Sequence, residues 1–322
     1  MESAVITRAQ PEKILKDLAK LWVDLGKQSD QGVLRACSMT LIVVIEETQD
    51  ASAIGEAIAG LMHEHPSRAI VVRIRECPEP CLEARVFAQC WMPVGRHEQI
   101  CCEQVEITAA RRSLADVPAV ILGIVAPDLP VVLYCPDVGL CLSPEFQTLP
   151  PLAGKVVIDS GSSGDLAGIR YLQSLLKNAY RRADLEWGRL TGWREAVAQI
   201  FEDSSRRKAA QSLKKARIVH TQSATSPAVH YLSGWFRNVL GEGIQIELLS
   251  ENGPSSASIR RLELEAPGFH ATIEMKDASS AELQVDGVSQ RVVFPQWTEQ
   301  DLLRQELSIT GRDRIFEEVL DR

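Results

Sequence analysis

The stretch VLRACSMTLIVVIEE, residues 33–47, decides the fold class of the first half of this chain. Its apolar run is continuous rather than alternating, which is typical of a strand buried on both faces of a sheet. Helical patterns flank it, because residues 11–26 begin with Pro11 and then place apolar side chains at helical spacing, and a second helix is expected at about 51–63. This alternation predicts an α/β domain with a mixed sheet.

The same pattern continues to about residue 160. We expect strands at SRAIVVRIRE (67–76), EARVFAQCWM (83–92), EQICCEQVEIT (98–108) and DLPVVLYCP (128–136), with a helix at about 113–126. All eight cysteines lie in this first part, between Cys37 and Cys141. The cysteine distribution therefore supports an N-terminal α/β domain over residues 1–160.

The second half has a different organisation. Residues 161–216 are expected as a helical connector. SPAVHYLSGWFRNVLG (226–241) predicts a helix with Ser226 as its N-cap and Gly241 just past its end. Short alternating strands then follow with tight turns, and two helices close the chain. Residues 217–322 are therefore expected as an α+β domain with an antiparallel meander.

The bulk composition limits the function classes. The net charge is −8 and the pI is about 5.4, which argues against nucleic acid as the main partner. No apolar run reaches the ~18 residues of a membrane span. The first residues lack the apolar segment of a signal peptide. We expect a cytoplasmic protein that binds neither a membrane nor nucleic acid.

A Gly/Ser loop between a strand and a helix is the most site-like element of the first half. In VVIDSGSSGDLAG (156–168), Asp159, Ser160, Ser162 and Gly164 form a candidate anion loop at a helix N-terminus. The lysine of the Walker A motif and the G-x-G-x-x-G fingerprint are both missing. A structural loop with Asp165 as a helix cap is the alternative.

The cysteines offer a candidate redox site. Cys101 and Cys102 are adjacent on an expected strand, so their side chains point to opposite faces, and either could meet Cys90 on the neighbouring strand. Free thiols buried as small apolar groups are the alternative. The histidines lie in no recognisable nucleophile arrangement. We therefore expect no catalytic residues, no metal site and no cofactor.

The segment DLEWGRLTGWREAVAQIF (184–201) concentrates two tryptophans and two arginines in eight residues. A helix is expected from about Gly192, with Thr191 as its N-cap, which leaves Trp187 in a loop-like lead-in. Tryptophan and arginine are enriched where partners bind. The predicted partner-binding residues are Asp184, Trp187, Arg189, Trp193 and Arg194, and packing of Trp187 inside the protein is the alternative interpretation.

This segment also resembles the signature DLNWxRLTPWRE of the glucose-6-phosphate dehydrogenase assembly protein family, OpcA. Further stretches are similar to family elements in the same order, over roughly residues 33–320: RACSMTLIVV, HPSRAIVV, ICCEQVEI, DLPVVLYCP, VVIDS and SGWFRNVLG. The chain departs from the pattern at Tyr134 and Cys135, where two tryptophans are common, and at Glu186, Gly188 and Gly192.

The resemblance implies a non-catalytic protein that binds glucose-6-phosphate dehydrogenase and promotes its active oligomer, in the oxidative pentose phosphate pathway. In photosynthetic relatives it also implies a link to thiol redox state. An allosteric effector of this kind acts by binding one state of the enzyme more tightly. An anion- or sugar-phosphate-binding enzyme or sensor that uses the loop at residues 159–165 remains the alternative.

Overall fold

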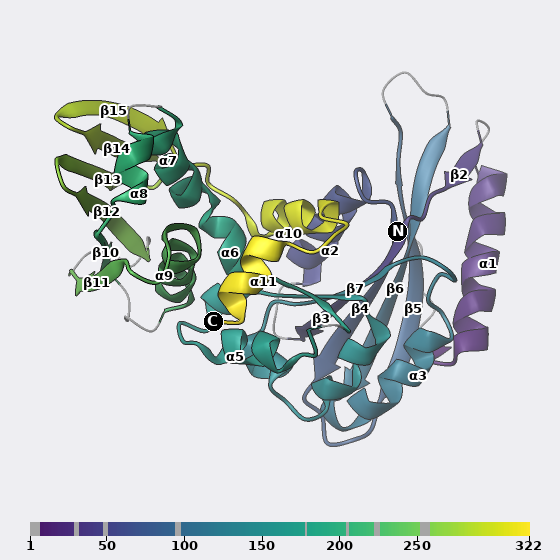
Figure 1. Ribbon diagram of the computed structural model, residues 1–322. Helices are drawn as coiled ribbons and strands as arrows, with labels where there is room; N and C mark the ends of the chain where they lie inside the picture. Colours follow the sequence, from purple (N-terminus) through teal and green to yellow (C-terminus); the bar gives the residue numbers. More distant parts are fainter. Residues whose placement is uncertain are drawn as a thin grey trace. The chain divides into compact units, whose positions relative to one another are not determined.

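The computed structural model describes residues 7–28, 32–47, 51–93, 98–177, 179–203, 206–221, 226–251 and 258–322. Over these residues the chain forms two compact units (Figure 1). The first unit holds the chain up to Ile158, with Leu176–Arg182 and Glu306–Ser308. The second holds Asp159–Leu175, Ala183–Gln305 and Ile309–Arg322. Most of the expected connector, residues 161–216, thus lies in the second unit, and its residues 176–182 lie in the first.

The first unit is built on a nine-stranded sheet with the order β1-β5-β6-β4-β3-β7-β8-β9, in which β2 also pairs with β6. The strands are β1 (Thr7–Arg8), β2 (Val33–Arg35), β3 (Met39–Glu46), β4 (Ser67–Arg75), β5 (Leu82–Trp91), β6 (Gln99–Ala110), β7 (Val131–Cys135), β8 (Lys155–Ile158) and β9 (Arg181–Asp184, whose last two residues belong to the second unit).

The apolar run of β3 lies at the centre of this sheet. β3 pairs in parallel with β4 on one side and β7 on the other, and its residues are buried except at the last position. Parallel strands covered on both faces read as continuous apolar runs, which explains the pattern in the sequence. β5 is antiparallel to β6, so the sheet is mixed, and the predicted α/β class is confirmed.

Helices accompany this sheet. They are α1 (Pro11–Gln28), which packs against β5, α2 (Ala51–Met62), α3 (Val117–Leu122) and α4 (Val138–Cys141), with short 3-10 turns at Arg111–Asp116, Phe146–Thr148 and Pro150–Leu152. The single helix expected at 113–126 is wrong, because the 3-10 turn at Arg111–Asp116 is followed by the short helix α3. Pro118 lies in the first turn of α3, where its missing N–H would have no partner within the helix.

No described helix is both long enough and apolar enough to cross a bilayer.

A buried ion pair joins neighbouring strands of this unit. Arg68 at the start of β4 donates Nε–H to Glu103 Oε2 of β6 at 2.7 Å, and both side chains are almost fully buried. Glu103 also accepts from Trp22 Nε1 of α1 at 2.5 Å, and Arg68 donates to the carbonyl of Ile124. Buried charges need such complete pairing.

The second unit is built on a six-stranded sheet of order β11-β10-β12-β13-β14-β15. The strands are β10 (Lys215–His220), β11 (Gln245–Ser250), β12 (Ile259–Ala266), β13 (Phe269–Asp277), β14 (Ser280–Val285) and β15 (Val288–Val293). β10 and β11 are parallel, and the other neighbours are antiparallel. The predicted α+β domain with a meander is confirmed.

Several helices belong to this unit: α5 (Ala167–Ser174), α6 (Leu185–Arg189), α7 (Thr191–Glu202), α8 (Arg207–Gln211), α9 (Pro227–Leu240), α10 (Glu299–Ser308, whose last residues belong to the first unit) and α11 (Arg314–Leu320). The helix predicted at 226–241 is confirmed as α9. Ser226 Oγ accepts from Val229 N–H at 3.5 Å, and Gly241 follows the helix with a φ of 91°. Gly234 of α9 faces Val319 of α11.

Two helical glycines provide a matched test of this packing. A Cβ at Gly234 would lie 2.8 Å from Val319 Cγ1, whereas a Cβ at Gly26 of α1 would meet nothing within 4 Å. We expect Gly234→Ala to lower the free energy of unfolding by about 1–2 kcal/mol. Gly26→Ala should raise it by about 0.5–1 kcal/mol, because the unfolded chain loses entropy. Denaturant unfolding followed by circular dichroism measures both, and shifts of the same sign would contradict the close helix contact.

Candidate functional site

The Trp/Arg segment at residues 184–201 forms two consecutive helices, α6 and α7. Asp184 Oδ1 accepts from Glu186 N–H at 3.0 Å and thereby caps α6. The expectation of a loop around Trp187 is therefore wrong, because this cap starts a helix seven residues early. Thr191 is the first residue of α7 rather than its N-cap, which is Leu190.

Trp187 is packed inside the second unit. Only 4% of its surface is exposed, and its Nε1–H donates to Asp313 Oδ2 at 3.1 Å. Its ring contacts Tyr231 and Phe316 edge-on or at a tilt. The Arg194 guanidinium lies over it, 3.6 Å from the ring centroid. This cation–π contact lies within the second unit, and the alternative interpretation, packing of Trp187 inside the protein, describes the position of the ring.

The other members of the predicted partner surface differ in exposure. Trp193 is 6% exposed and meets Phe294 edge-on, with 5.1 Å between ring centroids. Asp184 is fully buried. A third of the Arg189 side chain is exposed. A partner would therefore reach the arginines of this segment before its tryptophans, and the partner role of the segment stays a prediction.

Asp184 joins three elements that are distant in the sequence. It accepts from Ser160 N–H at 3.0 Å and from the Tyr231 hydroxyl at 2.7 Å, in addition to the start of α6. Burial raises the pKa of Asp184 to about 6, although these hydrogen bonds oppose the shift. The 3-10 turn at Ser160–Ser162, α6 and α9 are thereby held together at one carboxylate.

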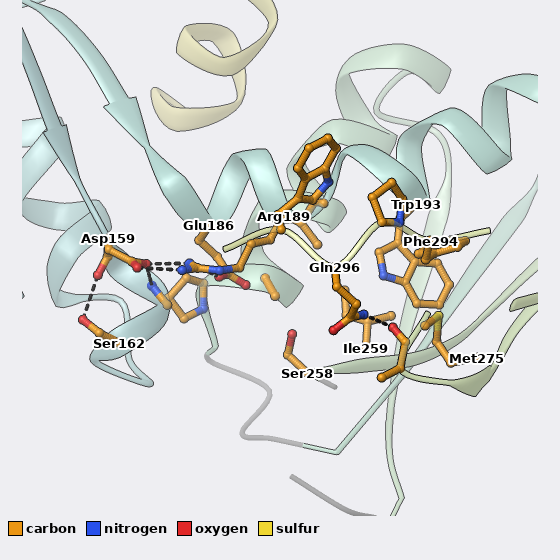
Figure 2. A pocket seen from close by; sticks show the side chains of 17 residues that line it. Asp159, Ser162, Glu186, Arg189, Trp193, Ser258, Ile259, Met275, Phe294 and Gln296 are labelled. Atoms are coloured by element: carbon orange, nitrogen blue, oxygen red, sulfur yellow. Dashed lines mark hydrogen bonds and ion pairs between the residues drawn. The ribbon is translucent and has the colours of Figure 1, made fainter. Parts of the chain in front are cut away.

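The predicted anion loop instead meets the guanidinium of Arg189 (Figure 2). Arg189 donates to Asp159 through both terminal nitrogens, at 2.6 and 2.7 Å, and to Glu186 Oε2 at 3.0 Å. Burial raises the pKa of Glu186 to about 7, while the Arg189 charge pulls it down. The two carboxylates raise the pKa of Arg189 against the effect of burial. By sequence pattern Asp159 and Arg189 belong to two separate candidate sites, and the structure joins them in one ion pair.

Backbone N–H groups of this loop donate hydrogen bonds to side chains of the protein, so they are not offered to an anion. Gly161 N–H donates to Asp159 Oδ1 at 3.1 Å. Ala167, the first residue of α5, donates its N–H to Asp165 Oδ1 at 2.8 Å, although the N-cap position itself is Leu166. Ser162 Oγ donates to the Asp159 carbonyl at 2.8 Å, and Gly164 turns the chain with a φ of 69°. A Cβ at position 161 would clash with Glu186 and Arg189, which explains the glycine. Anion binding by this loop stays a prediction, and the bonding of its N–H groups within the protein does not favour it.

These residues line a cavity of about 510 Å³ in the second unit (Figure 2). The ion-pair cluster forms one part of its wall, which continues with Leu190 at the N-cap of α7 and with Trp193 inside that helix. The sheet and the segment after β15 supply residues that the sequence patterns did not identify: Ser258, Ile259, Met275, Ala278, Phe294, Pro295, Gln296 and Trp297. They come from separate strand ends, so no local motif marks them.

The three candidate redox cysteines divide into a bonded pair and a free thiol. Cys90 of β5 and Cys101 of β6 lie directly opposite each other and form a disulfide. Cys102 is buried and free, and desolvation raises its pKa to about 11. A redox role for these residues stays a prediction. Within the described parts of the chain, no group of three or more His, Cys, Asp or Glu could hold a metal ion.

The buried carboxylates predict a pH-dependent stability. A carboxyl whose pKa is raised in the folded state stabilises the fold fully below its ordinary pKa of 4.5, and this contribution is lost as the pH rises through about 7. Between about pH 5 and pH 8 the free energy of unfolding of the wild type should fall by about 1–3 kcal/mol more than that of Glu186→Gln. Urea unfolding at a series of pH values, followed by tryptophan fluorescence, measures this difference. The exposed control Glu195→Gln should show the same fall as the wild type. If Glu186→Gln also shows the wild-type dependence of unfolding free energy on pH, the raised pKa of the buried carboxyl is contradicted.

The ion pairs of Arg189 predict that removing this cation destabilises the protein far more than breaking an exposed ion pair does. Arg189→Ala would leave Asp159 and Glu186 without their cation, and we expect a loss of about 2–4 kcal/mol, since Arg189 is partly solvated. Adding Asp159→Asn should restore part of this loss, because it removes one uncompensated charge. Arg291→Ala, which breaks a highly exposed pair with Asp277, is the control and should change stability by under about 0.5 kcal/mol. Strictly additive losses in the double variant would refute the coupling.

The chain is similar to known proteins along most of its length. Two family models, which describe the N-terminal and the C-terminal domain of a glucose-6-phosphate dehydrogenase subunit, match residues 59–174 and residues 180–320 respectively. A Nostoc punctiforme protein described as OxPP cycle protein OpcA is 26% identical over 232 residues, which are 64% of this chain and 48% of that protein. The protein of the same description from Synechocystis is 27% identical over 193 residues, 58% of this chain and 39% of that protein.

The chain thus spans about half, or less, of the length of the curated relatives it matches. Among solved structures, an oxidoreductase from Sinorhizobium meliloti aligns with a TM-score of 0.50 at 8% identity, over 88% of this chain and 94% of that one. At this identity the likeness concerns the fold alone. The two family models together cover most of the chain, and they match in the order in which the motifs occur. This chain belongs to the glucose-6-phosphate dehydrogenase assembly protein family, OpcA.

Proposed function

We propose that this protein binds glucose-6-phosphate dehydrogenase and acts on it as a non-catalytic assembly factor and allosteric effector that favours the active oligomer. The observation that carries the proposal is the match of both domain models of a glucose-6-phosphate dehydrogenase subunit, one after the other, along the chain. The names of the relatives place those proteins in the OxPP cycle, which agrees with this partner.

The physical basis of such an effect is linkage. A protein that binds one oligomer or conformation of an enzyme more tightly than another shifts the population toward it, by no more than its differential affinity. A preference of about 3 kcal/mol shifts the equilibrium roughly a hundredfold. No chemical step by the chain's own residues is needed for this role.

The open face of α7 is the part of the Trp/Arg segment that we propose for the contact. Trp193, Ala196, Val197 and Ile200 point into the second unit and are buried, whereas Glu195, Ala198 and Gln199 are exposed. The buried rings fix the helix, so that this face and the partly exposed Arg189 and Arg194 are presented on a rigid support. Rigid supports reduce the entropy lost on binding.

Mixing the chain with glucose-6-phosphate dehydrogenase from the same source tests the function. Particle mass by light scattering and initial rates should show a larger complex and a higher activity with the chain than without it. The chain alone should show no turnover of glucose 6-phosphate. A mixture that never co-elutes and leaves the rate unchanged would refute the proposal.

Two matched charge reversals locate the contact. Glu195→Arg changes the open face of α7, and Glu56→Arg makes the same change on the exposed face of α2 in the first unit. We expect Glu195→Arg to weaken complex formation about tenfold or more, because a mismatched charge at an interface costs affinity. Glu56→Arg should bind as the wild type. Equal affinities would place the contact away from α7.

A further inference from the structure

We propose that the cavity of the second unit binds an uncharged polyhydroxylated molecule, a monosaccharide or a cyclitol. This inference goes beyond the effector role and does not depend on it, because it rests on the lining of one cavity within one unit. The cavity volume of about 510 Å³ lies in the range of small-molecule sites.

The polar part of the wall offers donors and acceptors side by side. Glu186 binds Arg189 through Oε2, and within the described residues its Oε1 accepts no hydrogen bond. Arg189 likewise uses its two terminal nitrogens, while its Nε–H makes no bond to the described residues. A hydroxyl group both donates and accepts, so neighbouring hydroxyls of a polyol match an adjacent carboxylate oxygen and guanidinium N–H.

These polar groups are held in place before any ligand arrives. Both carboxylate oxygens of Asp159 accept hydrogen bonds from the Arg189 guanidinium, and Gly161 N–H orients this carboxylate. The Asp184 carboxylate accepts from the backbone N–H groups of Ser160 and Glu186 and so holds the backbone at both positions. A site whose side chains are already ordered loses less entropy on binding, which matters for a small polar ligand.

The rest of the wall is apolar and aromatic. Trp193, Phe294, Met275 and Ile259 face the cavity beside Gln296, as Figure 2 shows. The ring carbons of a sugar or cyclitol form apolar C–H patches that pack well on such side chains, while its hydroxyls point to the polar wall. A fully apolar ligand would leave the Glu186–Arg189 wall desolvated without partners, at a high cost.

The charge of the lining argues against a phosphorylated ligand. Arg189 is the one Lys or Arg among the described lining residues, and it is already paired with Asp159 and Glu186. The three groups together carry a formal charge of −1 when Glu186 is ionised. Among the described lining residues a phosphate group would meet two carboxylates and no cation beyond the already paired Arg189, which disfavours it by like-charge repulsion.

Ligand-observed NMR and calorimetric titration of the intact chain, without any partner enzyme, test the proposal. The probes are D-glucose, D-mannose, sorbitol and myo-inositol, with glucose 6-phosphate and inorganic phosphate as the charged counterparts. We expect saturable binding of at least one uncharged probe at about millimolar affinity, and at least about tenfold weaker binding of glucose 6-phosphate.

Variants tie the binding to this cavity. Glu186→Gln replaces an acceptor without changing size, and Gln296→Ala alters an exposed residue whose loss should leave the fold intact. Each should weaken the binding several-fold to about tenfold, and the distant control Arg291→Ala should not. The proposal is overturned if no uncharged probe binds saturably, if glucose 6-phosphate binds more tightly, or if binding is indifferent to both variants. None of these outcomes depends on an interaction with glucose-6-phosphate dehydrogenase.

Discussion

A single buried carboxylate organises the second unit. The Asp184 carboxylate caps α6 and accepts a hydrogen bond from the N–H of Ser160 in the loop that follows β8. It also accepts one from the hydroxyl of Tyr231 in α9. A fully buried carboxylate is costly, and the cost is tolerable because each of its oxygens is hydrogen-bonded. With this anchor in place, Arg189 at the end of α6 reaches Asp159, and the polar wall of the cavity forms. The Trp/Arg signature of the family therefore begins with the residue on which the local structure depends.

A buried and fully hydrogen-bonded carboxylate also occurs in the first unit, where residues of two other family-like stretches meet. Arg68 of HPSRAIVV and Glu103 of ICCEQVEI form a buried ion pair, and Glu103 also accepts a hydrogen bond from Trp22 Nε1. Removing one member of such a pair leaves an uncompensated charge, so both residue types must be kept together. These residues of the family-like stretches therefore meet a requirement of the fold. The same holds for Trp187, whose ring is enclosed by Tyr231, Phe316 and Arg194.

The sequence predicted the elements whose signals are local. The strand β3, the helix α9 with its Ser226 cap and the meander of the second unit follow from periodicity and turn residues. Sequence patterns do not reveal α6, because a five-residue helix has too few turns to show a period and because its cap, Asp184, falls in the segment predicted as a partner surface. The sequence also could not join Asp159 to Arg189, which lie 30 residues apart, nor foresee that strand ends from β12 to β15 complete the same cavity. Such contacts follow from tertiary packing, and no short motif encodes them.

The helix pair α6 and α7 contributes both to the cavity proposed for a small ligand and to the face proposed for the partner enzyme. Glu186 and Arg189 line the cavity, while Glu195 and Gln199 belong to the exposed face of the next helix. The two helices are joined at Leu190, and Trp193 connects the same helix to the cavity wall through Phe294. A small molecule in the cavity would alter partner binding only if it favoured one arrangement of this helix pair over another, and the coupling would then act equally in both directions. Tight packing of Trp187 and Trp193 makes the pair stiff, so ligand and partner would bind independently unless the Asp159–Arg189 pair itself has two states.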